Sequence, residues 1–284
     1  MHSDQLVAIL LPDGNNQFFS RMAQLIQREL LNSGVGMLML DSDASLINEF
    51  NSIQWLKSMS CSDHIAAVIY IPSGDSTENF EALFSIDLPV IILDREIADG
   101  FCPRPIDRIY SNNQRGMQMV VNHLHDLGVQ KVAYLSGPES TEPGRVRNRV
   151  FRESWESLGC SLIGDFKGDF SLQSGQANAQ AMLRLRESPD AVVAANDLMA
   201  IGALQVLQES GHAVPRDLLL TGYDDIAMCS WIYPKLTSVR QNIEEVARLA
   251  ALCVVKRIDG GSKQGSSVDF VEPELVIRGS TTQT

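Results

Sequence analysis

The sequence of 284 residues has no run that approaches the roughly 18 consecutive apolar residues of a membrane-spanning helix, and its N-terminus lacks the charged and apolar regions of a signal peptide. Its five cysteines form no Cys-x-x-Cys pair, and their odd number favours reduced, buried thiols over disulfides or a zinc site. P-loop, G-x-G-x-x-G and G-x-S-x-G motifs are missing as well. These absences predict a cytoplasmic protein with no metal, no cofactor and no common enzyme signature.

Positive charge is also scarce, because 23 Lys and Arg residues stand against 35 Asp and Glu residues and leave a formal charge of -12. Such a surplus repels phosphate backbones and anionic lipid headgroups, so we expect this chain to bind neither DNA nor a membrane unaided. The hydrophobic content of 44% is typical of a folded globular protein. The length fits two domains of about 100–150 residues or one large α/β domain.

Strand and helix patterns alternate along the first part of the chain. The run Leu6–Leu11 is short, continuous and apolar, as in a strand buried on both faces, and an amphipathic helical pattern follows it as far as Gly34. The same step repeats, with strands expected over residues 37–40, 66–71 and 90–93 and helices over 47–59 and 80–85. This alternation predicts βαβ crossovers around a parallel sheet.

A second series of the same kind begins after the breaker-rich segment 99–105 and a short strand near 108–110. The pattern predicts helices over 116–127, 147–158, 175–185 and 197–210, and strands over 131–135, 162–165, 191–195 and 218–221. A last helix over 243–258 and an apolar segment over 273–277 are too little for a third domain. We therefore expect two α/β lobes that share these final segments.

Polar side chains follow nearly every predicted strand. Examples are Asn16 after the first strand, Asp94 with Arg95 after the fourth, and Asn196 and Asp224 in the second lobe. Ligands of open parallel sheets bind outside the carboxyl ends of the strands. Carboxylates, amides and a guanidinium with nearby aromatic rings suit a polyhydroxylated ring, whose hydroxyls both donate and accept and whose C–H face stacks on π systems.

Each of these residue types also has a structural interpretation. Asn16 and Asn196 are good helix N-caps, and Asp224 with Asp225 fits either a turn or the paired carboxylates of an acid–base site. Phe18 and Phe19 would ordinarily be core residues. The arginines at 145, 147, 149 and 152 would ordinarily form a solvated helix face.

Taken in order along the chain, these segments resemble the effector-binding core of the lactose-repressor family (LacI/GalR), which shares its fold with periplasmic sugar-binding proteins. The resemblance spans almost the whole sequence. It implies two Rossmann-like lobes with parallel sheets, joined by three crossover strands. The N-terminal lobe would comprise residues 4–111 and 242–268, and the C-terminal lobe residues 112–241 and 269–284. The matching segments begin with 15–19 (NNQFF), 89–95 (PVIILDR), 127–138 (LGVQKVAYLSGP) and 168–170 (GDF), and continue with 195–204 (ANDLMAIGAL), 221–226 (TGYDDI), 236–241 (LTSVRQ) and 273–280 (PELVIRGS).

The resemblance also implies a site. A small effector would be held as the two lobes close on it, by binding rather than turnover and without a cofactor. Gln17, Val150 and the segment 111–113 depart from the family pattern. The ligand contacts that the resemblance implies are similar to those for a small pyranose such as ribose. Carried over position by position, the ligand contacts are Asn16, Phe18, Phe19, Asp94, Arg95, Arg147, Phe170, Asn196, Asp224 and Gln241.

Three functions follow as hypotheses. The first is the ligand-sensing domain of a homodimeric transcription regulator, in which the effector modulates operator binding by an N-terminal helix-turn-helix head. Since the sequence begins at the first core strand, we expect that this head was trimmed rather than naturally absent. The second is a periplasmic-type sugar-binding protein of an uptake system, which would be monomeric. The third is a sugar hydrolase that uses Asp94 and Asp224.

Overall fold

A computed structural model describes residues 5–60, 64–95, 106–260 and 267–282 of the chain. The chain divides into two compact units, Met1–Ser111 with Asn242–Val271 and Asn112–Gln241 with Glu272–Thr284, so it passes from one unit to the other three times. The third passage follows Val271 rather than residue 268, because the strand Val268–Val271 pairs with the strand Asp107–Ser111 of the first unit. Cys61 and Cys102 lie outside the described residues.

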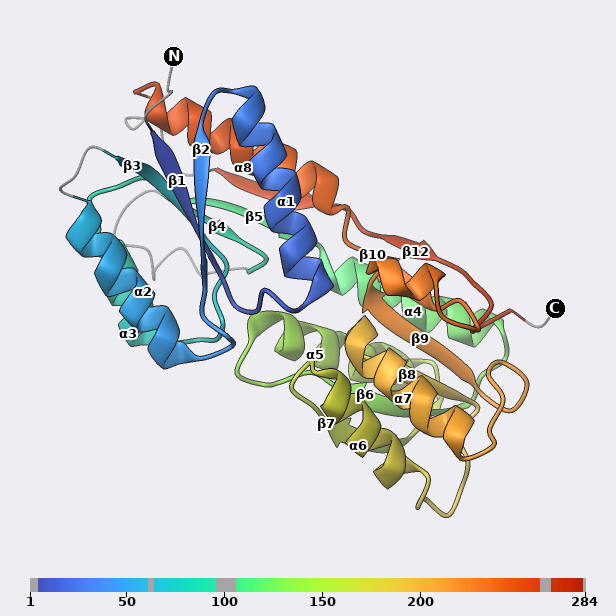
Figure 1. Cartoon of the computed structure of the whole chain (residues 1–284). Helices are drawn as coiled ribbons and strands as arrows, with labels where there is room; N and C mark the ends of the chain where they lie inside the picture. Colours follow the sequence, from blue (N-terminus) through green and yellow to red (C-terminus); the bar gives the residue numbers. More distant parts are fainter. Residues whose placement is uncertain (1–4, 61–63, 96–105, 261–266, 283–284) are drawn as a thin grey trace. The chain divides into compact units, whose positions relative to one another are not determined.

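The first unit is a six-stranded parallel sheet with helices on both faces (Figure 1). Its strands follow the spatial order β11-β5-β4-β3-β1-β2, and α1 packs with α8 while α2 packs with α3. The elements are β1 (Leu6–Leu11), α1 (Gln17–Asn32), β2 (Gly36–Asp41), α2 (Leu46–Met59), β3 (Ile65–Tyr70), α3 (Thr77–Phe84), β4 (Val90–Leu93), β5 (Asp107–Ser111), α8 (Ile243–Ile258) and β11 (Val268–Val271).

The second unit repeats this plan with the spatial order β12-β10-β9-β8-β6-β7. Among its helices, α4 packs with α5 and α6 packs with α7. The elements are α4 (Asn113–Asp126), β6 (Lys131–Ser136), α5 (Glu142–Ser157), β7 (Ser161–Lys167), α6 (Leu172–Met182), β8 (Ala191–Ala194), α7 (Asp197–Glu209), β9 (Leu219–Asp224), the 3₁₀ turn η2 (Ala227–Ser230), β10 (Thr237–Arg240) and β12 (Glu274–Val276).

Strand burial explains why the apolar runs were informative. All residues of the central strands β4 and β8 are buried, as are five of the six in β1, because helices cover both faces of each sheet. The edge strands β2 and β7 are partly exposed and correspondingly less apolar. The predicted α/β fold of two parallel sheets is confirmed, with one correction: β12 runs antiparallel to β10.

Helices α4, α5 and α6 begin three to five residues earlier than hydrophobic periodicity predicted, whereas α7 and α8 begin at the predicted residues. Helix α5 begins at Glu142 rather than at residue 147, because the Thr141 side chain accepts a hydrogen bond from the Gly144 N–H and caps it. Similarly, α4 begins at Asn113 behind the cap Asn112, and α6 at Leu172. A polar cap residue therefore fixes where each of these helices starts.

Candidate functional site

The most connected side chain of the predicted set is Arg147 on α5, which is only 3% exposed. Its Nε donates to the Asn113 side-chain oxygen at 2.9 Å and its Nη1 donates to the Ala195 carbonyl at 2.9 Å. The same nitrogen lies 3.5 Å from a carboxylate oxygen of Asp224. The solvated-face interpretation is therefore wrong for Arg147, although its neighbour Arg149 is exposed.

Asp224 ends β9 and lies beside Arg147 in the second unit. Its Oδ1 also accepts a hydrogen bond of 2.6 Å from the side-chain amide of Gln241, which follows β10 and is 1% exposed. The backbone of Asp224 has a φ of 110°, in a region that non-glycine residues rarely adopt. Such strain is typical of functional sites, where the surrounding structure holds a residue in place for its chemistry.

Asn196 and Phe170 are joined to each other in the same unit. The Asn196 side-chain amide donates to the Phe170 carbonyl at 2.9 Å, while its oxygen accepts from the Met199 N–H at 3.0 Å and caps α7. The cap interpretation of Asn196 is thus confirmed. Phe170 has a φ of 70°, and its ring centroid lies 5.9 Å from the Arg147 guanidinium carbon. The five predicted contacts of the second unit form one connected cluster: Arg147, Phe170, Asn196, Asp224 and Gln241.

The first-unit candidates Asn16, Phe18 and Phe19 lie where β1 leads into α1. The Asn16 side chain accepts from the Phe18 N–H at 3.0 Å and caps the helix, so its cap interpretation is confirmed. Phe18 is buried and meets Phe19 edge to face, with 5.1 Å between the ring centroids. The expectation that these rings belong to the core therefore holds for Phe18, whereas Phe19 is half-buried.

Asp94 and Arg95 follow β4 in the first unit. Arg95 is 5% exposed, and its Nη1 lies 3.4 Å from an Asp75 carboxylate oxygen in the segment between β3 and α3. Asp94 is half-buried with a φ of 63°. Asp94, Phe170 and Asp224 thus share the same rare left-handed backbone region.

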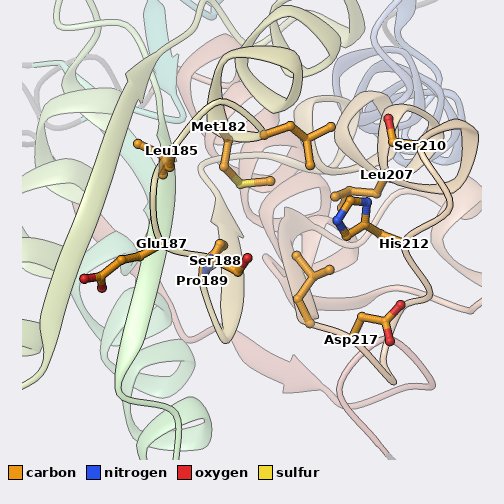
Figure 2. Close-up of a pocket in the computed structure, with 11 residues that line it drawn as sticks. Met182, Leu185, Glu187, Ser188, Pro189, Leu207, Ser210, His212 and Asp217 are labelled. Atoms are coloured by element: carbon orange, nitrogen blue, oxygen red, sulfur yellow. The ribbon is translucent and has the colours of Figure 1, made fainter.

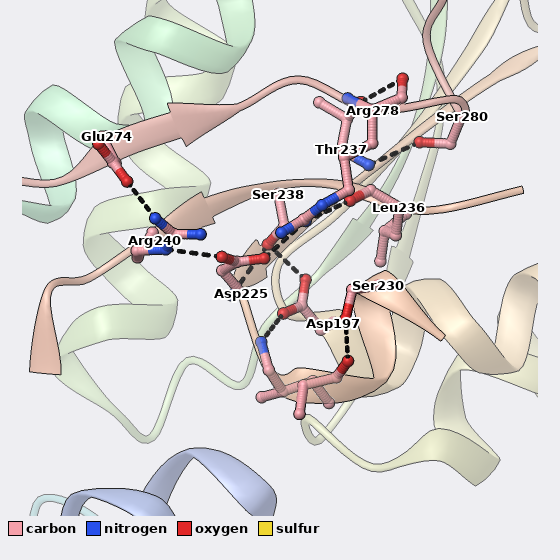
Figure 3. Close-up of polar contacts among 12 residues, drawn as sticks. Asp197, Asp225, Ser230, Leu236, Thr237, Ser238, Arg240, Glu274, Arg278 and Ser280 are labelled. Carbon is pink, nitrogen blue, oxygen red and sulfur yellow. Dashed lines mark hydrogen bonds and ion pairs between the residues drawn. The ribbon is translucent and has the colours of Figure 1, made fainter. Parts of the chain in front are cut away.

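Sequence reasoning did not single out Asp197, which directly follows Asn196 at the end of β8. Asp197 is fully buried. Its carboxylate accepts a hydrogen bond of 2.6 Å from the Ser238 hydroxyl and one of 2.9 Å from the Ile226 N–H (Figure 3). Burial, with Asp224 as a nearby like charge, raises the pKa of the Asp197 carboxyl to about 8. The N–D pair in the sequence was the only available signal, and it was shared with ordinary helix caps.

The second carboxylate of the Asp224–Asp225 pair has a structural role. Asp225 forms ion pairs with Arg240 at 2.7 Å and with Arg278 at 2.6 Å, and Arg240 also reaches Glu274 (Figure 3). These contacts tie β9 to β10 and to the segment that follows β12. Asp225 is therefore occupied by two guanidinium groups, and the pair does not form the two adjacent carboxylates of an acid–base site.

The raised pKa of Asp197 predicts a pH-dependent stability. A carboxyl whose pKa is higher in the folded than in the unfolded chain stabilises the fold below its unfolded value of 3.8, and this contribution is lost as the pH rises toward about 8. The substitution Asp197→Asn removes the charge and keeps an acceptor oxygen. We expect the stability of the variant relative to the parent to increase between pH 5 and pH 9, as measured by urea unfolding. An equal difference at both pH values would contradict this assignment.

A cavity of about 370 Å³ lies elsewhere in the second unit (Figure 2). Its wall includes Ser188 and Pro189, which precede β8, and Asp217 and Leu218, which precede β9. It therefore lies at the amino ends of these strands, whereas Asn196 and Asp224 lie at their carboxyl ends. The cavity contains none of the predicted contact residues: it is lined by Met182, Leu183, Leu185, Glu187, Ser188, Pro189, Leu207, Ser210, His212, Asp217 and Leu218.

The part of the chain that the structure describes, residues 5–60, 64–95, 106–260 and 267–282, contains neither a membrane-spanning helix nor a metal-binding cluster. In these residues no helix is both long and apolar enough to cross a membrane. In the same residues no group of three or more His, Cys, Asp or Glu side chains is arranged to hold a metal ion.

Comparisons with known proteins agree with this architecture. Residues 121–281 match the family described as the periplasmic binding protein-like domain. The chain is 30% identical to the HTH-type transcriptional regulator DegA of Bacillus subtilis, over 98% of this chain and 81% of the relative. It is 24% identical to the ribose operon repressor of Halalkalibacterium halodurans, over 97% and 79% of the two chains.

Solved structures give the same result. A LacI family transcriptional regulator from Enterococcus faecium, crystallised with bound ribose, is 27% identical and covers 98% of each chain with a TM-score of 0.83. The match extends over both units, and the family match covers more than half of the sequence. The chain therefore belongs to the periplasmic binding protein-like domain family and, within it, to the LacI/GalR-type transcriptional regulators.

Proposed function

We propose that this chain is the ligand-sensing and dimerisation domain of a LacI/GalR-type regulator and that its effector is a small sugar of the ribose type. The observation that carries the proposal is the buried cluster of Arg147, Asp224 and Gln241 at strand carboxyl ends, with Phe170 beside it. Arg147 supplies hydrogen-bond donors, Asp224 supplies acceptors, and an aromatic face suits the C–H side of a sugar ring.

The first unit contributes the other half of the proposed contact set. Asp94 and Arg95 offer an acceptor and a donor after β4, while Asn16 and Phe19 offer an amide and a half-buried ring after β1. Sugar binding by strand exits of both units would favour one arrangement of the two lobes over another. An effector acts as a switch only through such a difference in affinity between two states.

The regulator interpretation also sets the partners. A homodimer is supported by the aromatic side chains of Trp231 and Tyr233, which are 75% and 87% exposed in the second unit. Operator binding then falls to a helix-turn-helix head outside these 284 residues, in keeping with the net charge of -12. We place the protein in the cytoplasm with its operator and assign it no catalytic step, because its relatives DegA and the ribose operon repressor are regulators.

The test is isothermal titration of the protein with D-ribose, alongside other pentoses, hexoses, sugar phosphates and purines. We expect saturable binding of ribose without any chemical change of the sugar. At about 100 times its dissociation constant the ligand adds about 2.7 kcal/mol of stability, so thermal unfolding gives a second readout. A monomer on gel filtration would favour the transport alternative, and binding of purines alone would overturn the sugar assignment.

A further inference from the structure

The Arg147 guanidinium lies over the ring of a buried tyrosine that sequence reasoning did not single out. Its central carbon is 3.7 Å from the centroid of the Tyr223 ring, against 5.9 Å for Phe170. Tyr223 is 0% exposed and directly precedes Asp224 on β9. A cation this close to a desolvated aromatic face is attracted by the negative charge of the ring face.

Other groups fix the edge of the same guanidinium. Asn113 and the Ala195 carbonyl each accept a hydrogen bond of 2.9 Å from Arg147. These two acceptors set the rotation of the guanidinium within its plane, and the Tyr223 ring sets the plane itself. Nη1 also lies 3.5 Å from a carboxylate oxygen of Asp224. The side chain is therefore held in position by groups of the protein itself.

The sequence provides the space that this arrangement needs. Gly116 on α4 lies against Tyr223, and a Cβ atom built on it would be 2.2 Å from the tyrosine hydroxyl oxygen and 2.8 Å from Cζ. Any larger residue at 116 would push the ring out of its place. The position of the ring under Arg147 thus depends on a specific glycine of the neighbouring helix.

We propose that Tyr223 is a positioning residue for effector binding: its ring face holds the Arg147 guanidinium in place by a cation–π contact, with Gly116 providing the room. This inference rests on the proposed function, in which Arg147 donates to the effector. A long side chain that is ordered in advance loses less conformational entropy on binding. Tyr223 therefore raises effector affinity without touching the effector.

The test replaces Tyr223 with phenylalanine and then with mono-, di- and trifluorophenylalanine. Fluorine withdraws electrons from the ring face but hardly changes its size, so a purely space-filling role predicts constant affinity. We expect Tyr223→Phe to bind D-ribose within about threefold of the parent, and the trifluoro ring to bind about 3- to 30-fold more weakly than phenylalanine, with intermediate values between. A dissociation constant that does not change along the series would overturn the proposal.

A matched control is Phe151, which is equally buried in the second unit and stacks on Tyr134 and Trp155. Trifluorophenylalanine at position 151 should leave ribose affinity unchanged. Gly116→Ala should weaken binding, since the ring must move. If alanine at 116 and the fluorinated rings at 223 all bind as tightly as the parent, the positioning role is excluded.

A ligand-free readout separates this proposal from the proposed function. Nuclear magnetic resonance relaxation of the Arg147 Nε–H reports how firmly the guanidinium is held in the absence of any sugar. We expect its order to fall along the fluorinated series. Should the parent bind no ribose, the ribose assignment fails, while falling order still supports the cation–π contact. Unchanged order along the series would contradict the contact itself.

Discussion

Replacing Arg147 with alanine is expected to weaken effector binding by about 2–5 kcal/mol, which is a factor of about 30 to several thousand. The substitution removes the donors that face the proposed ligand and leaves Asp224, 7% exposed at its side chain, without its guanidinium partner. A buried carboxylate that loses its counter-charge also lowers the stability of the folded protein, so unfolding of the variant is measured beside its binding. Titration calorimetry with D-ribose measures the effect directly.

Arg149→Ala is the matched control, because Arg149 lies on the same helix and is exposed. It should bind the sugar as the parent does. Arg147→Lys should fall between the two, since a lysine keeps the charge but lacks the planar fork that meets Asn113 and Ala195 together. Circular dichroism of each variant verifies that the fold persists. Parent-like affinity of the alanine variant would remove Arg147 from the effector site.

The parallel sheets were predictable because burial on both faces leaves a clear trace in the sequence. The runs that became β1, β4 and β8 are short and almost wholly apolar, and helical patterns separate them. The direction of β12 was not predictable. Its three residues pair antiparallel with β10, and a pairing across 34 to 38 positions has no local signature.

Periodicity alone misplaced several helix starts. The first turn of α5 contains Pro143 and Gly144, which carry no apolar pattern, so the predicted helix began only at Arg147. The cap at Thr141 and the proline after it were the better signals. The arginines of α5 lie on different faces of the helix. Arg147 faces the core, while Arg149 faces the solvent.

The predicted site residues of the second unit proved to be connected, but the groups that hold them were not predicted. Asp197 contacts Ser238 at the point where Ser238 of β10 stands opposite Gly222 of β9, and the absence of a side chain at Gly222 leaves room for the Asp197 carboxylate. Tyr223 meets Arg147 because β9 and α5 are packed in one core. Motifs reveal residues that follow a strand, whereas these supporting contacts depend on tertiary packing between segments far apart in the sequence.

Glu49 is the clearest case in the first unit. A glutamate in the first turn of a helix ordinarily faces the solvent, yet Glu49 on α2 is 0% exposed. Its carboxylate accepts hydrogen bonds of 2.6 Å from each of three donors, which are the Tyr70 hydroxyl, the Ser73 N–H and the Asn79 side-chain amide. Burial and the neighbouring Glu49 charge raise the pKa of Tyr70, so this hydroxyl remains a donor.

Glu49→Ala is therefore expected to destabilise the protein by about 3–5 kcal/mol, as measured by urea unfolding. The truncation leaves three donors without their acceptor, and each buried donor left unpaired costs about 1–3 kcal/mol, less where water enters the space. Glu49→Gln should lose less stability, because its amide oxygen still accepts hydrogen bonds, although its NH₂ group faces a donor instead of accepting from it. Glu81→Ala, at an exposed position of α3, should change the stability by no more than about 0.5 kcal/mol.

The position of Glu49 links its effect to the proposed effector site. Ser73, whose N–H donates to the Glu49 carboxylate, lies two residues before Asp75, the ion-pair partner of Arg95. A loosened segment between β3 and α3 should free Arg95 as well, so sugar affinity is expected to fall in the glutamine variant even at temperatures where it is fully folded. Loss of stability with unchanged affinity would confine Glu49 to a structural role, and it would show that the first-unit contacts do not depend on the β3–α3 segment.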